Sequence, residues 1–192
     1  GRLDYDLWER LGHNPIRLLR EVDRPRLNQA SKDTEYLALF DRVFASFDAY
    51  MNQEMTWTSQ AHPELKGRPI AYFSMEFGLH ETLPIYSGGL GVLAGDHLKE
   101  ASDLGLPLTG VGFMYAEGYF SQRISEDGWQ DALNNMLDFK NLPALPVLDH
   151  SGKRLCVDVE FPDRTVSLGL WELHVGRIPL YLLDSNLEQN SD

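Results

Sequence analysis

The sequence predicts an α/β protein in which a helical N-terminal part precedes a parallel sheet with an added β-hairpin. Three observations support this fold class. Apolar residues recur at helical spacing through residues 1–62, two apolar runs flank a further helical segment after residue 63, and the last third alternates apolar and polar residues. We therefore expect a helical extension over residues 1–62 and an α/β domain over residues 63–192.

Composition narrows the classes of function. Seventeen Lys and Arg against twenty-nine Asp and Glu give a net charge of −12, which argues against nucleic acid or an anionic membrane as a partner. No apolar run approaches the roughly 20 residues that span a bilayer. The single cysteine, Cys156, excludes an internal disulfide and fits a reducing, cytoplasmic compartment. The chain starts without Met or a signal region, so we expect it to be part of a longer polypeptide.

The helical part contains three expected segments. Leu3, Leu7 and Leu11 form a stripe that ends at Gly12, and a second helix starts at Asn14 with proline in its first turn. The third, longer segment opens at residues 31–35 and carries a broad apolar stripe, which predicts packing against a neighbouring helix or domain. Its members are Tyr36, Leu37, Phe40, Val43, Phe44, Phe47 and Met51.

Strand, helix and strand follow one another in the middle of the chain. Residues 70–77 suit a buried strand, a glycine-rich loop ends at Gly91, and a helix continues to residue 104. Residues 108–115 form the second apolar run, so a parallel βαβ unit is expected.

The last third predicts further strands. Residues 155–161 and the run from 165 alternate apolar and polar residues around turn residues 162–164, which indicates a hairpin. Residues 179–184 read as another buried strand whose carboxyl end opens a loop.

The glycine-rich loop is the first candidate site. Gly88, Gly89 and Gly91 precede a helix whose free N–H groups and dipole favour phosphate or another oxyanion. A simple turn with positive φ is the alternative. The spacing Gly89-x-Gly91-x-x-Ala94 also matches the dinucleotide fingerprint, but these glycines follow the strand by some ten residues.

Other chemistry has weaker support. His80, Glu81 and His97 lack the spacing of a metal site, so no metal is expected. Cys156 is expected to be a small core residue, and Trp129 is expected to pack under a loop.

Residues 71–115, reading AYFSMEFGLHETLPIYSGGLGVLAGDHLKEASDLGLPLTGVGFMY, strongly resemble the α-glucan (glycogen or maltodextrin) phosphorylases. The resemblance continues through residues 117–123 and 127–130. Residues 7–10 and 12–15 resemble the extension of the long bacterial and archaeal branch of this family. The resemblance therefore covers essentially the whole chain.

The resemblance implies the N-terminal part of a Rossmann-like GT-B glycosyltransferase. Such enzymes cleave the terminal α-1,4 link of a glucan with inorganic phosphate and release glucose 1-phosphate. They carry pyridoxal phosphate on a lysine of the C-terminal domain, which would be this chain's partner in the parent. We further expect a homo-oligomer. Two alternatives to a phosphorylase remain: a glycogen or starch synthase, and a non-catalytic carbohydrate-binding remnant.

The resemblance implies substrate-binding roles for four residues of this chain. Gly88 and Gly89 match the loop whose amides meet the substrate phosphate, and Leu90 continues it beside the glucosyl site. Glu76 matches an acidic residue of the sugar subsite, although pairing with an arginine or a backbone amide is its alternative. No lysine of this chain matches the cofactor lysine, and no catalytic residue is assigned here.

Overall fold

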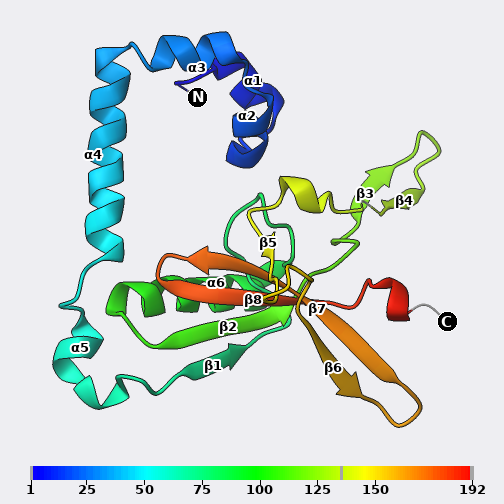
Figure 1. Cartoon of the computed structure of the whole chain (residues 1–192). Helices are drawn as coiled ribbons and strands as arrows, with labels where there is room; N and C mark the ends of the chain where they lie inside the picture. Colours follow the sequence, from blue (N-terminus) through cyan, green and yellow to red (C-terminus); the bar gives the residue numbers. More distant parts are fainter. Residues whose placement is uncertain (1, 135, 191–192) are drawn as a thin grey trace. The chain divides into compact units, whose positions relative to one another are not determined.

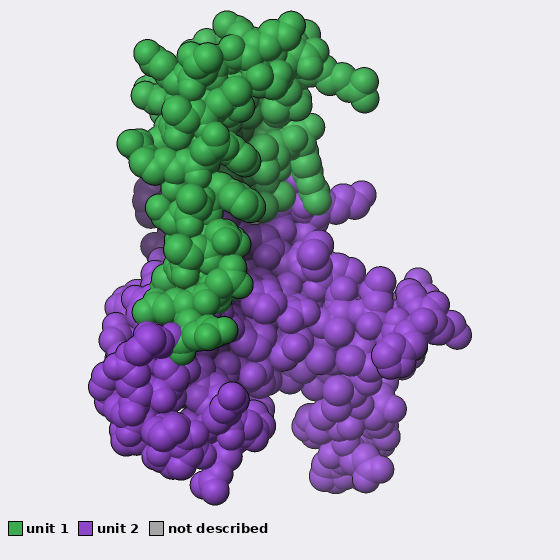
Figure 2. All heavy atoms as spheres, turned by 60° about the vertical axis from the view of Figure 1, so that its left-hand side comes forward, with its two compact units in different colours: residues 1–54 green, residues 55–192 purple. Residues whose placement is uncertain are grey.

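The computed structural model describes residues 2–134 and 136–190, which fall into two compact units, Gly1–Glu54 and Met55–Asp192 (Figures 1 and 2). The division places the short helix α5 (Trp57–Ala61) in the second unit. The sequence placed the end of the helical extension later, at residue 62, and this domain boundary stays a prediction.

The helices of the first unit begin at side-chain caps. Their bounds are α1 (Tyr5–Arg10), α2 (Pro15–Glu21), α3 (Arg24–Ala30) and α4 (Thr34–Met51). In each, an Asx side chain accepts a backbone N–H of the first turn, which satisfies a donor that the helix leaves free. These caps are Asp4, Asn14, Asp23 and Asp33.

Packing in this unit is limited. Leu7 and Leu11 meet Leu18 and Val22 in a small core, as the first stripe predicts. The helix α3 was not expected, because its sequence has too few apolar residues to show a period. None of the residues of α4 is fully buried, and most of its apolar stripe is exposed.

The second unit contains a mixed sheet in the order β1-β2-β8-β7-β5, with β6 paired to β7 (Figure 1). The pairs β1–β2 and β2–β8 are parallel, whereas β8–β7 and β6–β7 are antiparallel. The predicted βαβ unit and the predicted hairpin are therefore confirmed. The strands are β1 (Ile70–Phe73), β2 (Leu108–Phe113), β5 (Leu145–Pro146), β6 (Cys156–Glu160), β7 (Thr165–Val175) and β8 (Ile178–Asp184), and the separate hairpin is β3 (Ser121–Ile124) with β4 (Gln130–Leu133).

Helix α6 (Gly88–Leu104) connects β1 to β2 and packs on one face of the sheet (Figure 1). Leu98 reaches the strands beside Leu180, in one core. A Cβ on Gly95 would lie 2.1 Å from the carbonyl oxygen of Gly78, so only glycine allows this approach of helix and loop. The helix ends at Gly105 in left-handed backbone, as expected.

The start of α6 corrects the sequence interpretation. The predicted glycine-rich loop is instead the first turn of the helix, because Ser87 is the N-cap and the helix already includes Gly88, Gly89 and Gly91.

Short turns of 3-10 helix within the described residues lie at η1 (Pro63–Leu65), η2 (Phe139–Asn141) and η3 (Glu188–Asn190).

The sheet face opposite α6 carries apolar side chains at its β1 side. Phe73 is 72% exposed and pairs with Val111, whose neighbour Gly110 faces Leu98 of α6. Since side chains alternate along a strand, Phe73 and Val111 lie on the other face. Parallel sheets are normally covered on both faces.

We therefore expect the isolated chain to self-associate. Sedimentation velocity over a range of concentrations measures this, and Phe73→Lys is expected to shift the distribution toward monomer. Phe161→Lys, an equally bulky exposed residue next to the β6–β7 turn, is the matched control and should shift it less. A chain that stays monomeric at high concentration and binds no hydrophobic dye contradicts the prediction.

Candidate functional site

The candidate site lies at the carboxyl ends of the parallel strands, where α/β sheets bind ligands. The segment after β1 carries Glu76, the segment after β2 carries Tyr115, and Ser185 and Asn186 follow β8. Strand β1 is shorter than the predicted run, since it ends at Phe73. The hydroxyl of Ser74 donates to the carbonyl of Glu76 at 2.8 Å, and this turn brings the carboxylate toward α6.

Glu76 is tied to the start of α6. Its Oε2 accepts the backbone N–H of Ser87 at 3.1 Å, and its Oε1 accepts the hydroxyl hydrogen of Tyr119. A carboxylate at a helix N-terminus is favourable because it meets the positive end of the dipole. The backbone-amide partner that the sequence left as an alternative is thus present, while a role of Glu76 toward a sugar stays a prediction.

The predicted glycines lie in the first turn of α6, directly after Ser87, whose backbone N–H Glu76 accepts. Gly88 has left-handed backbone (φ +73°), whereas Gly89 does not, and a Cβ on Gly89 would meet nothing within 4 Å. Leu90 is 64% exposed. The first-turn amides of a helix lack intrahelical acceptors. This arrangement leaves room for an anion at Gly88, Gly89 and Leu90, and their binding roles stay predictions.

Two tyrosines complete this cluster and were missed from the sequence. Tyr115 donates to the carbonyl of Met75 at 2.8 Å, and burial, followed by the charge of Glu76, raises the pKa of its hydroxyl. The hydrogen bond to Glu76 raises the pKa of Tyr119 to about 12. In both tyrosines, these surroundings favour the neutral phenol over the charged phenolate. Tyr119 lies 43 residues from Glu76, so no local pattern pointed to the pair.

We expect Glu76→Gln to lower the pKa of Tyr119 toward the usual value of about 10. In the wild type, the hydrogen bond between Tyr119 and Glu76 stabilises the fold fully below pH 10, the ordinary pKa of a tyrosine in an unfolded chain. This contribution is lost as the pH rises through the folded-state pKa of about 12. Titration of ¹³Cζ-labelled tyrosine by NMR measures both values. Tyr181, whose pKa is raised first by burial and then by Glu172, is the internal control and should not move. An unchanged Tyr119 titration would show that Glu76 is not its partner.

Two hollows adjoin the tyrosines. A cleft of about 250 Å³ has Met75, Tyr115, Asp184, Ser185 and Asn186 among its lining residues. A smaller hollow of about 160 Å³ is lined by Tyr115, Glu117, Gly118 and Tyr119. Tyr115 lines both hollows.

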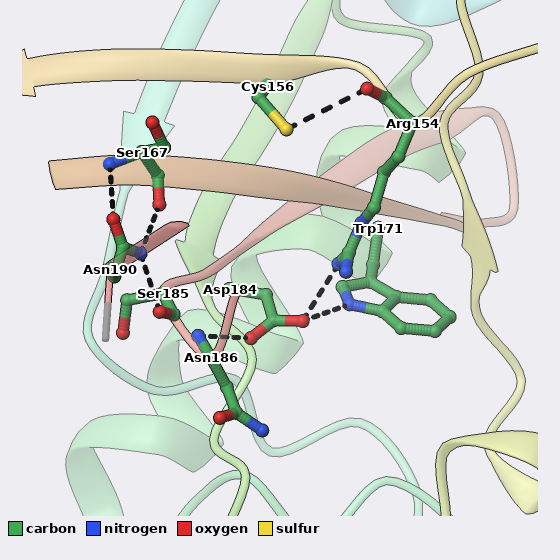
Figure 3. Close-up of polar contacts among 8 residues, drawn as sticks. All are labelled: Arg154, Cys156, Ser167, Trp171, Asp184, Ser185, Asn186 and Asn190. Atoms are coloured by element: carbon green, nitrogen blue, oxygen red, sulfur yellow. Dashed lines mark hydrogen bonds and ion pairs between the residues drawn. The ribbon is translucent and has the colours of Figure 1, made fainter. Parts of the chain in front are cut away.

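Asp184 is the third residue whose role the sequence analysis missed. It ends β8 on the same side as Leu180 and Leu182, and it is 1% exposed. Its carboxylate meets Arg154 at 2.8 Å, and the Arg154 guanidinium lies 4.8 Å from the ring of Trp171 (Figure 3). A signal was available: in the alternation of residues 178–184 an aspartate occupies a core-facing position, which requires a buried partner.

The remaining candidates do not converge on the site. The ring Nδ1 of His80 is 2.9 Å from the Thr82 hydroxyl, and His97 packs against the Tyr72 ring. Within residues 2–134 and 136–190, no three potential ligands gather as a metal site would require. Cys156 is half-buried. Trp129 is 77% exposed, so the expectation that it packs under a loop was wrong.

Among the described helices, none combines the length and the apolar character that crossing a bilayer requires.

The fold and site define an α/β protein with a cleft at the carboxyl edge of a mixed sheet. A family model described as "Protein of unknown function (DUF3417)" matches residues 1–83. The chain is 42% identical to maltodextrin phosphorylase of Thermococcus litoralis over 96% of its length, and 44% identical to glycogen phosphorylase of Aquifex aeolicus over 98%. Glycogen phosphorylase of Mycobacterium tuberculosis is 42% identical over 98% of the chain.

These matches confirm the resemblance stated from the sequence. The chain corresponds to the N-terminal part of the glycogen and maltodextrin phosphorylases. It spans 22–26% of the length of these relatives.

Proposed function

We propose that this chain forms one side of the catalytic cleft of an α-1,4-glucan phosphorylase of the GT-B type, which releases glucose 1-phosphate from glycogen or maltodextrin. The observation that carries this proposal is the identity of 42–44% over nearly the whole chain to proteins named as such phosphorylases. The position of Glu76 and the glycine turn at one edge of the sheet supports it. The synthase and binding-remnant alternatives receive no support from these names.

The proposed roles come from the family resemblance, and the geometry of α6 supports them. The free amides at Gly88 and Gly89 would bind the substrate phosphate, which requires donors that are already oriented. Leu90 lies next to them and would contact the glucosyl unit. Glu76, held by Ser87 and Tyr119, would accept hydrogen bonds from sugar hydroxyls.

Pyridoxal phosphate is the cofactor that the family implies. When bound, it supplies a phosphate group for acid–base chemistry. A Schiff base requires a lysine in an enclosed, desolvated setting. The five lysines here are all exposed, so this chain does not fit the group; they are Lys32, Lys66, Lys99, Lys140 and Lys153. We therefore assign the cofactor to the C-terminal domain of the parent. As further proposals, the parent forms a homo-oligomer and is located in the cytoplasm.

The test uses the full-length polypeptide that contains this chain. We expect it to release glucose 1-phosphate from maltodextrin and inorganic phosphate, and not to transfer glucose from a nucleotide sugar. Both reactions are measured with the same preparation. Transfer from a nucleotide sugar without phosphorolysis would support the synthase alternative, and absence of both activities with retained glucan binding would support the remnant.

A further inference from the structure

The segment that follows β8 forms one wall of the cleft of about 250 Å³ and is attached to the sheet at both ends. At its start, Asp184 accepts Arg154 Nη2–H at 2.8 Å and Trp171 Nε1–H at 2.9 Å through Oδ2 (Figure 3). Its Oδ1 accepts the backbone N–H of Asn186 at 2.9 Å. One buried carboxylate therefore joins the core to the backbone of the cleft wall.

The end of the segment is held by Asn190. Its Oδ1 accepts the backbone N–H of Ser167 at 2.9 Å. Its Nδ2 donates to the carbonyls of Ser167 and Ser185, each at 2.7 Å. Residues 185–190 thus form a short loop whose two ends are fixed to β7 and β8, which limits its motion.

This loop presents polar side chains to the cleft. Ser185 and Asn186 are exposed and line it, with Met75 and Tyr115 among the other lining residues. Within the described residues, the Ser185 hydroxyl and the Asn186 side-chain amide have no hydrogen-bond partner from the protein. An aromatic and apolar wall with a few oriented polar groups is typical of a small-ligand site.

The charges indicate a neutral ligand. The charge of Arg154 is already matched, because this residue is paired with Asp184 and lies against Trp171. The amide and hydroxyl that remain can each both donate and accept hydrogen bonds. This set suits the hydroxyl groups of a sugar better than an anion.

We propose that Ser185 and Asn186 form a hydroxyl-binding wall for a glucosyl unit of the glucan, and that Asp184 is the positioning residue of this wall. The inference rests on the proposed function for the identity of the sugar. Only 1% of Asp184 is exposed, and its carboxylate acts on the ligand through the Asn186 backbone that it binds. Its replacement would leave buried donors of Arg154 and Trp171 without an acceptor.

The test measures binding of maltoheptaose to the full-length polypeptide by calorimetry, without phosphate. Asn186→Ala and Ser185→Ala remove exposed groups and should leave the melting temperature unchanged. Each is expected to raise the dissociation constant about three- to tenfold, as the loss of one hydrogen bond does. Ser185→Thr retains the hydroxyl and should restore most of the affinity.

Asp184→Asn is also expected to weaken binding, although the proposed ligand-binding side chains of Ser185 and Asn186 are retained. Asp158→Asn is the control for the same chemical change elsewhere, because Asp158 accepts the hydroxyl hydrogen of Ser167 on β7 and does not line the cleft. If Asp184→Asn does not fold, the Asn186 and Ser185 variants decide. Wild-type affinity in both of these variants, or no binding by the wild type, overturns the inference. Failure to release glucose 1-phosphate overturns only the proposed function, since calorimetry needs no turnover.

Discussion

The isolated 192-residue chain is expected to release no glucose 1-phosphate from maltodextrin and phosphate, and to hold no covalent pyridoxal phosphate. The physical reason is that phosphorolysis requires phosphate, cofactor and sugar to meet in one water-excluded cleft. Here the glycine turn is open to solvent, and every lysine is exposed. The expected effect is a complete loss relative to the full-length polypeptide.

Two measurements check this expectation on the same preparation. Glucose 1-phosphate is assayed after incubation with substrate, and cofactor absorbance is recorded after dialysis. The full-length polypeptide is the positive control. Product release by the isolated chain, or absorbance that survives dialysis and is discharged by hydroxylamine, would show that the chain contains a complete site.

Gly89→Ala in the full-length polypeptide is expected to lower phosphorolysis by about 10²–10³-fold, because the added Cβ would keep the anion away from the first-turn amides, and losing the contact of an oriented donor with an oxyanion has about this effect. The structure sharpens this test. The methyl group meets nothing within 4 Å in this chain, and Gly89 is not in left-handed backbone, so the fold should not be destabilised. A lost rate would therefore report an anion at the amides. Apparent affinity for maltodextrin should change less than the phosphate step.

Gly88→Ala is the informative contrast. Its left-handed backbone makes alanine unfavourable by about 1–3 kcal/mol, so this variant is expected to lower stability as well as rate. Lys99→Ala, on an exposed position of the same helix, is the neutral control. Phosphate and maltodextrin are varied separately, and melting temperatures are recorded. If Gly89→Ala keeps kcat and the phosphate KM within about twofold of wild type, the glycines serve only the turn.

Much of the fold follows from short-range patterns. The cap at Asn14, the βαβ unit and the β6–β7 hairpin were all expected, because caps act over two or three residues and strand alternation has a period of two. The exact start of α6 was not expected, since a glycine run is compatible with both a loop and the first turn of a helix. Helix α3 was missed for lack of an apolar period.

The sequence by itself determined the family resemblance, the parallel pairing and the candidate residues Glu76, Gly88, Gly89 and Leu90. Only the tertiary structure decided what these residues touch. Glu76 meets Tyr119 across 43 residues of chain, and Arg154 meets Asp184 across 30. Such pairs depend on how strands and loops are placed by the packed core, and side-chain hydrogen bonds over these separations leave no periodic pattern in the sequence.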